Sequence, residues 1–91
     1  MTSYIFKITN PGDILKAENR FLDMFNSIQV DYQNNLLNKN TIDIVINYGQ
    51  LVIKQMRSFV LKRIYERKAD NITALIDVLK NLKGQNENNN D

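Results

Sequence analysis

The chain of 91 residues contains no cysteine, no histidine and no tryptophan, and it has only one proline and three glycines. Without cysteine, disulfides, thiolate nucleophiles and cysteine-based zinc sites are excluded. Without histidine, the side chain most used for proton transfer near neutral pH is missing. The glycines form no phosphate-binding loop, and the carboxylates do not recur at a metal-ligand spacing. We therefore expect no enzymatic activity, no metal, no cofactor and no small-molecule substrate.

A strong net charge and long hydrophobic runs are also missing. The formal net charge is only +2, with acids and bases spread along the chain, so bulk electrostatics indicate no particular partner. The apolar run near the start is too short for a signal-peptide core, and no window approaches the length of a membrane span. These features predict an intracellular, cytoplasmic protein without membrane association.

Helical periodicity is what the sequence does contain. From Asp13, a candidate N-cap, apolar residues recur every three or four positions as far as Leu36. Thr41 is the next candidate N-cap, and a second helix is expected to run from there through Val60. The apolar positions of a third stretch, 72–82, are rotated relative to those of the second helix. A kink or a break is therefore expected near Asp70.

Three segments follow from this pattern. Residues 1–12 carry TyrIlePheLysIle and a turn, which predicts an extended arm or strand. Residues 13–83 predict an all-α domain, built as a long antiparallel helical hairpin plus a shorter or kinked third helix. Gly84 is expected to end the last helix. Residues 84–91 are polar throughout, which predicts a disordered tail.

The second predicted helix has an unusually wide apolar surface. Between residues 42 and 60, apolar side chains cover more than half of the helix circumference. One amphipathic helix of the same chain covers only one side of such a rod, so we expect another chain to cover the second side. The expected partner is a second copy, in a homodimer or higher oligomer, or a different protein subunit.

The segment 54–68 concentrates positive charge, with six cations and one carboxylate. On a helical projection Lys54, Arg57 and Lys68 share a polar strip. Arg63 and Arg67 fall on the opposite, apolar side. The two arginines are therefore expected to be partly buried and paired with a carboxylate of another element or chain.

Two sets of candidate site residues follow. The candidate interface residues are Ile46, Ile53, Phe59, Val60, Leu61, Arg63, Tyr65 and Arg67. The candidate contacts with a nucleic-acid backbone, where each cation would release counterions, are Lys7, Lys54, Arg57, Lys62 and Lys68. The sequence leaves both alternatives open.

Residues 63–75, ArgIleTyrGluArgLysAlaAspAsnIleThrAlaLeu, resemble the end of the helical domain of GINS subunits of archaea and eukaryotes. The matching residues are Tyr65, Glu66, Arg67, Ile72 and Leu75. The chain departs from the pattern at Lys68, where the family has arginine, and at Asn71, where it has a basic residue. The resemblance implies a non-catalytic subunit of a replicative helicase assembly, held together by helix packing between chains.

Two functions are therefore predicted. The first is a non-catalytic scaffold or adaptor that associates through apolar helix faces, in DNA replication or other nucleic-acid machinery. The alternative is a small dimeric DNA-binding regulator of the ribbon-helix-helix type. In that class an N-terminal strand pairs with its twin and reads the major groove, and Lys7 would be the strong polar reader on the strand.

Overall fold

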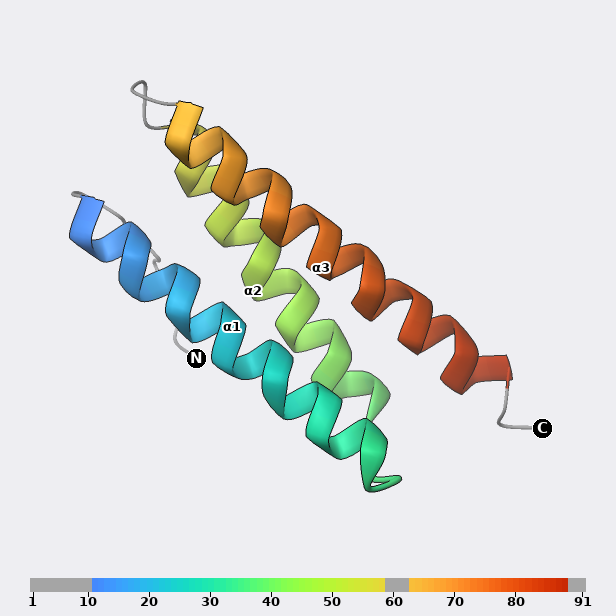
Figure 1. The fold of residues 1–91 in the computed structure, drawn as a ribbon. Helices are drawn as coiled ribbons and strands as arrows, with labels where there is room; N and C mark the ends of the chain where they lie inside the picture. The colour runs from blue at the N-terminus through green and yellow to red at the C-terminus, as the bar shows by residue number, and fades with distance from the viewer. Residues whose placement is uncertain (1–10, 59–62, 89–91) are drawn as a thin grey trace, which may run out of the picture.

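The structure, a computed structural model, describes residues 11–58 and 63–88, and in these ranges it is all-helical. The three helices are α1 (Pro11–Gln33), α2 (Lys39–Ser58) and α3 (Arg63–Asn88). In Figure 1, α1 and α3 run in the same direction and α2 runs in the opposite direction, with α2 packed against both neighbours. The predicted all-α class is confirmed.

Helix α1 begins earlier than predicted and ends in a well-formed cap. Pro11 takes the first helical position, where its fixed φ fits and no amide hydrogen is needed, so Asp13 lies in the first turn and is not the N-cap. At the other end Asn35 has a φ of 59°. The amide of Leu36 donates to the carbonyl oxygen of Asp31 at 2.8 Å, and that of Asn35 donates to Tyr32 at 3.3 Å. These two bonds form a Schellman motif.

Helix α2 also begins before the predicted N-cap. The side-chain oxygen Oδ1 of Asn38 accepts hydrogen bonds from the amides of Asn40 at 2.7 Å and Thr41 at 3.4 Å. Asn38 is therefore the N-cap, and the prediction of Thr41 is corrected. The helix ends at Ser58, whose hydroxyl donates to the carbonyl oxygen of Gln55 at 2.8 Å.

Helix α3 differs most from its prediction. It begins at Arg63 and runs unbroken past Asp70, so it is neither shorter nor kinked there, and at 26 residues it is the longest of the three. Its apolar stripe was rotated relative to that of α2 because it is a separate helix with its own neighbours. Gly84 has no positive φ, and the helix continues to Asn88, so the predicted helix end and tail are corrected for residues 84–88.

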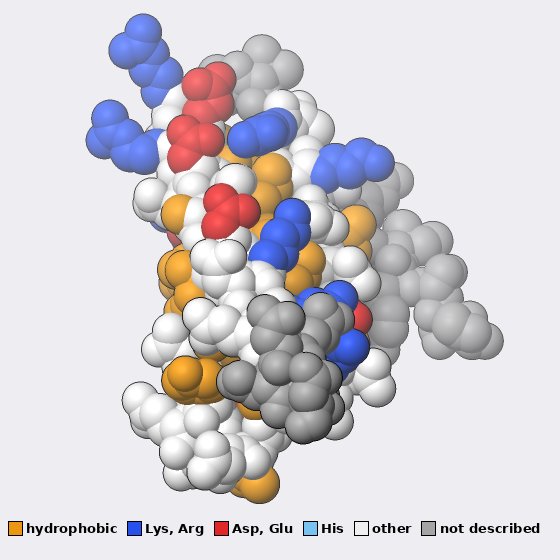
Figure 2. Space-filling view, turned by 90° about the vertical axis from the view of Figure 1, so that its right-hand side faces the viewer, with side chains coloured by type: hydrophobic (Ala, Val, Ile, Leu, Met, Phe, Trp, Pro, Cys, Tyr) orange, Lys and Arg blue, Asp and Glu red, His pale blue; other side chains and the backbone are white. Residues whose placement is uncertain are grey.

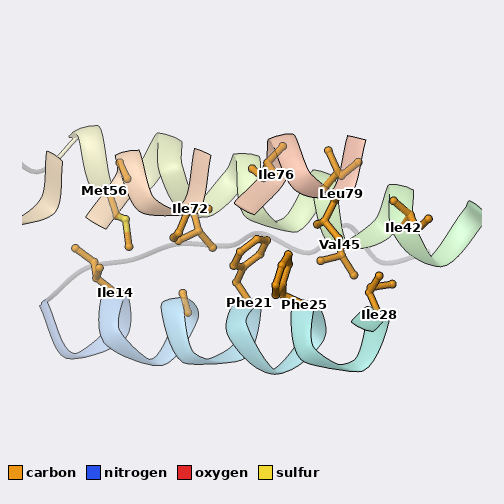
Figure 3. Close-up of a cluster of buried hydrophobic side chains, with 14 residues drawn as sticks. Ile14, Phe21, Phe25, Ile28, Ile42, Val45, Met56, Ile72, Ile76 and Leu79 are labelled. Carbon is orange, nitrogen blue, oxygen red and sulfur yellow. The ribbon is translucent and has the colours of Figure 1, made fainter. Parts of the chain in front are cut away.

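One hydrophobic cluster joins all three helices. Figure 3 shows the side chains of α1 pointing up into the space below α2 and α3. The buried members are Ile14, Ala17, Phe21, Phe25, Ile28, Ile42, Val45, Ile46, Val52, Met56, Ala69, Ile72, Ile76 and Leu79. Within the described ranges no polar or charged side chain is fully buried, so the core needs no internal polar network.

The wide apolar surface of α2 is largely covered by its own chain. Ile42, Val45, Val52 and Met56 are buried in the shared core, with α1 on one side of the helix and α3 on the other. The third predicted stretch folds back as a separate antiparallel helix and covers a second side of α2. The prediction that a second chain covers part of this helix stays a prediction, because Ile44 and Leu51 of α2 remain 60% and 42% exposed.

The predicted N-terminal arm, 1–12, lies mostly outside the described residues, which begin at Pro11. Pro11 and Gly12 belong to the first turn of α1. The last three residues of the predicted tail, 89–91, also lie outside the described part.

Candidate functional site

The candidate interface residues of the helix interiors lie inside the bundle. Ile46 is buried in the core, while Ile53 and Tyr65 are partly buried and pack against it. These three side chains therefore stabilise the single chain. Ile46 is 7% exposed and leaves little surface for a partner, whereas Ile53 and Tyr65 keep part of their surface and their interface role stays a prediction.

The two arginines lie on the surface. Arg63 and Arg67 are both exposed on α3, so the prediction of partly buried guanidinium groups is wrong. Lys68, on the same helix, is instead directed at α1. Its Nζ lies 2.9 Å from Oε1 of Glu18, and the two side chains are 29% and 15% exposed. This partly buried pair joins α3 to α1.

The candidate nucleic-acid contacts do not form one free basic face within the described residues. Lys54 is exposed on α2. Arg57 Nη2 lies 3.6 Å from Asp70 Oδ1, and Lys68 is paired with Glu18. Figure 2 shows acidic and basic side chains interspersed on one face of the molecule, with hydrophobic side chains visible between them. A phosphate backbone therefore meets no surface of a single sign on that face.

Five of the predicted site residues lie outside the described part of the chain. They are Lys7, Phe59, Val60, Leu61 and Lys62. Their predicted roles stay predictions.

A different apolar surface emerges between α1 and α3. Leu15, Glu18 and Leu22 are spaced i, i+3, i+7 and so share one face of α1. Glu18 contacts Lys68 of α3, which shows that this face borders α3. Leu15 and Leu22 are nevertheless 46% and 36% exposed. The face is thus turned toward α3, and its leucines remain open to solvent.

Helix α3 contributes a matching row. Lys68, Asn71, Leu75, Val78 and Leu82 are spaced i, i+3, i+7, i+10, i+14 and share one face of the helix. Lys68 again marks the direction of this face, because it reaches Glu18 of α1. Val78 is 41% exposed, and Leu75 and Leu82 are only partly buried at the edge of the core.

The two rows meet at the middle of the bundle. A Cβ built on Gly49 of α2 would contact both Phe21 of α1 and Ile76 of α3, so these two residues lie at the same height. Leu22 follows Phe21, and Leu75 and Val78 flank Ile76. We call the five side chains along this line the seam strip: Leu15, Leu22, Leu75, Val78 and Leu82.

The surroundings of the seam strip on α1 include both uncharged polar residues and the charged side chains of Lys16 and Asp23. Asn19 and Asn26 on α1 and Asn71 on α3 are exposed beside the leucines. The Glu18 and Lys68 pair neutralises its own charges where it crosses between the helices. Single exposed apolar residues are ordinary on any protein surface, but a row of five along one interhelical line is typical of an association surface.

Sequence reasoning missed this strip although a signal was present. Leu15 and Leu22 are seven residues apart and lie beside the buried stripe that includes Ile14 and Phe21. They widen the apolar arc of α1 beyond what one neighbouring helix covers.

Three further observations bound the chemistry of the described residues. In the ranges 11–58 and 63–88, no group of three or more acidic side chains is placed to hold a metal ion. No helix of the described chain is both long and apolar enough to cross a bilayer. Comparison with protein-family models, with curated proteins and with solved structures gives no match for this chain.

Proposed function

We propose that this chain is a non-catalytic helical scaffold or adaptor that binds protein through the seam strip. The observation that carries the proposal is the exposure of Leu15, Leu22 and Val78 beside the core that the three helices share. A row of exposed apolar side chains with polar and charged residues at its edge matches the composition of protein interfaces, whose centres are depleted of charge and whose rims are polar.

The geometry suits a helical partner. Two helices that run side by side form a groove, and an amphipathic helix laid along it makes contacts at i, i+3 and i+7 spacings. A helix added to a three-helix arrangement gives the four-helix packing in which apolar faces are fully enclosed. The bound partner would cover Leu22, Leu75 and Val78, and the binding free energy would come mainly from removing these side chains from water.

A role in DNA replication is the narrower form of this proposal. It is supported by the resemblance of residues 63–75 to the GINS helical domain, whose subunits assemble by helix packing. In α3 the apolar residues of that motif, Ile72 and Leu75, contribute to the core, and Glu66 and Arg67 face solvent. Nothing in the described residues specifically favours the ribbon-helix-helix alternative, and duplex binding that weakens on Lys7→Ala would revive it.

The proposal is tested by site-specific photo-cross-linking in the cells that make the protein. A benzophenone amino acid is placed at Leu22 in the seam strip and, as the control, at Ile44, an aliphatic site on α2 that is more exposed, at 60% against 36%. We expect a protein adduct from position 22 and none of comparable yield from position 44. Equal yields at both positions, or no protein adduct at 22, would refute the proposal. Mass spectrometry of the adduct identifies the partner.

A further inference from the structure

We propose that the protein bound at the seam strip is a second copy of this chain, related by a two-fold axis perpendicular to the helices, so that the two α1 helices pack antiparallel. This inference rests on the function proposed above and names its partner. It follows from the order of charges beside the strip.

Each strip leucine of α1 is followed directly by a charge of a different sign. Lys16 follows Leu15, and Asp23 follows Leu22, so the two charges are also seven residues apart and lie along one side of the strip. Both charged side chains are exposed. Along this side of the strip, α1 therefore carries a positive charge near its N-terminal end and a negative charge seven residues later.

An antiparallel two-fold arrangement makes this order self-complementary. When Leu15 of one copy packs against Leu22 of the other, Lys16 is brought beside Asp23, and the symmetry repeats the pair. Opposite charges at matching positions favour the correct register and disfavour others. The chain's net charge of only +2 adds little repulsion between copies.

The proposed two-fold axis also passes close to a small residue of α3. The midpoint of Leu15 and Leu22 falls beside Asn19. Because Phe21 and Ile76 lie at one height, the corresponding position on α3 is Ala74. Ala74 is exposed, and its methyl group allows the two α3 helices to approach closely near the axis.

Charge reversal provides a direct test. Lys16→Glu places two acids opposite each other in both symmetry-related pairs, and Asp23→Lys places two lysines there. We expect each single variant to raise the dimer dissociation constant about tenfold, since each replaces two attractive pairs by two repulsive ones. The double variant Lys16→Glu/Asp23→Lys restores both attractions and should dimerise like the wild type.

Mixing the two single variants gives the sharpest result. In the mixed dimer, Glu at position 16 meets Lys at position 23, and Asp23 meets Lys16, so both pairs are attractive. We expect equimolar mixing to recover dimer, measured by sedimentation equilibrium, with circular dichroism confirming that all variants remain folded. A parallel arrangement would instead pair position 16 with position 16 and position 23 with position 23, so the single variants would dimerise no more weakly than the wild type.

The outcomes separate this inference from the function on which it rests. A wild-type chain that stays monomeric, or single variants that fail to recover on mixing, would overturn the antiparallel self-association. If the photo-adduct at position 22 is then a different protein, the adaptor function stands without it. If there is no adduct at all, both fail.

Discussion

The ring of Phe21 lies directly against the backbone of Gly49, so closely that a Cβ built on the glycine would be 2.5 Å from Phe21 Cε1. The same Cβ would be 2.9 Å from Ile76 Cδ1. A residue of α2 thus leaves room for one side chain from each neighbouring helix. The absence of a side chain at this position fixes how closely the three helices pack.

We predict that Gly49→Ala destabilises the fold by about 1–3 kcal/mol. Alanine improves helix propensity by about 1 kcal/mol, but the added methyl group must displace the buried ring of Phe21, and overpacking a core costs more than that gain. The change is measured as a lower midpoint of denaturant unfolding.

Gly84→Ala is the matched control. Nothing lies within 4 Å of a Cβ at Gly84, and its φ is not positive. Alanine there should stabilise by up to about 1 kcal/mol, because α3 continues to Asn88. A destabilising Gly84→Ala would instead indicate that the helix stops at this glycine, as the sequence alone suggests.

A second prediction concerns the pair that joins α1 and α3. Glu18 is largely buried and accepts a hydrogen bond from Lys68, so a double-mutant cycle with Glu18→Gln and Lys68→Met should give a coupling energy of about 1–2 kcal/mol. This value lies between those of exposed and of buried pairs.

The pair between Arg57 and Asp70 serves as its comparison. Its side chains are 57% and 75% exposed and the closest atoms are 3.6 Å apart, so the coupling should be at most about 0.5 kcal/mol. Equal coupling energies for the two pairs would contradict the assigned burial. Arg63→Ala and Arg67→Ala should have smaller effects than Lys68→Met, the reverse of the sequence-based expectation.

A third prediction concerns the turn after α1. Asn35 adopts a φ of 59°, which asparagine tolerates and glycine adopts without cost. Asn35→Gly should be neutral or stabilise slightly, whereas Asn35→Val should destabilise by about 1–2 kcal/mol because a β-branched residue resists this conformation. The melting temperatures of the two variants, measured by thermal unfolding, check this prediction. An unchanged melting temperature for Asn35→Val would show that the turn does not require this backbone geometry.

The helices themselves were predictable from the sequence. Ile14, Phe21 and Ile28 recur at helical spacing and are all buried, because local periodicity and burial follow the same rule in an amphipathic helix. The caps were missed by two or three residues. Asn38 was hidden in a polar stretch where several asparagines offer the same capping oxygen, so sequence alone does not single one out.

What could not be predicted is how the helices share their faces. Whether Arg67 is buried depends on where α3 lies relative to α1 and α2, and a projection continued from α2 placed it on the wrong side. Glu18 and Lys68 are 50 residues apart in sequence, and no local pattern predicts that they meet. The seam strip is likewise a product of tertiary arrangement, since neither row of leucines is contiguous with the other in the chain.

A fourth prediction separates the seam strip from the core. Leu79→Ala should cost about 2–5 kcal/mol, because this side chain is fully buried. Leu22→Gln should change the unfolding free energy of the isolated chain by no more than about 1 kcal/mol, because leucine and glutamine have similar helix propensities and the site is already partly in water. A large loss of stability for Leu22→Gln would place Leu22 in the core.

Sedimentation equilibrium of the wild type beside Leu22→Gln tests association at the seam strip most directly, with Ile44→Gln as the control on the outer face of α2. We expect the wild type and Ile44→Gln to exceed the monomer mass with similar dissociation constants, and Leu22→Gln to be folded and monomeric. A wild type that remains monomeric, or a Leu22→Gln variant that associates as tightly as the control, would contradict it.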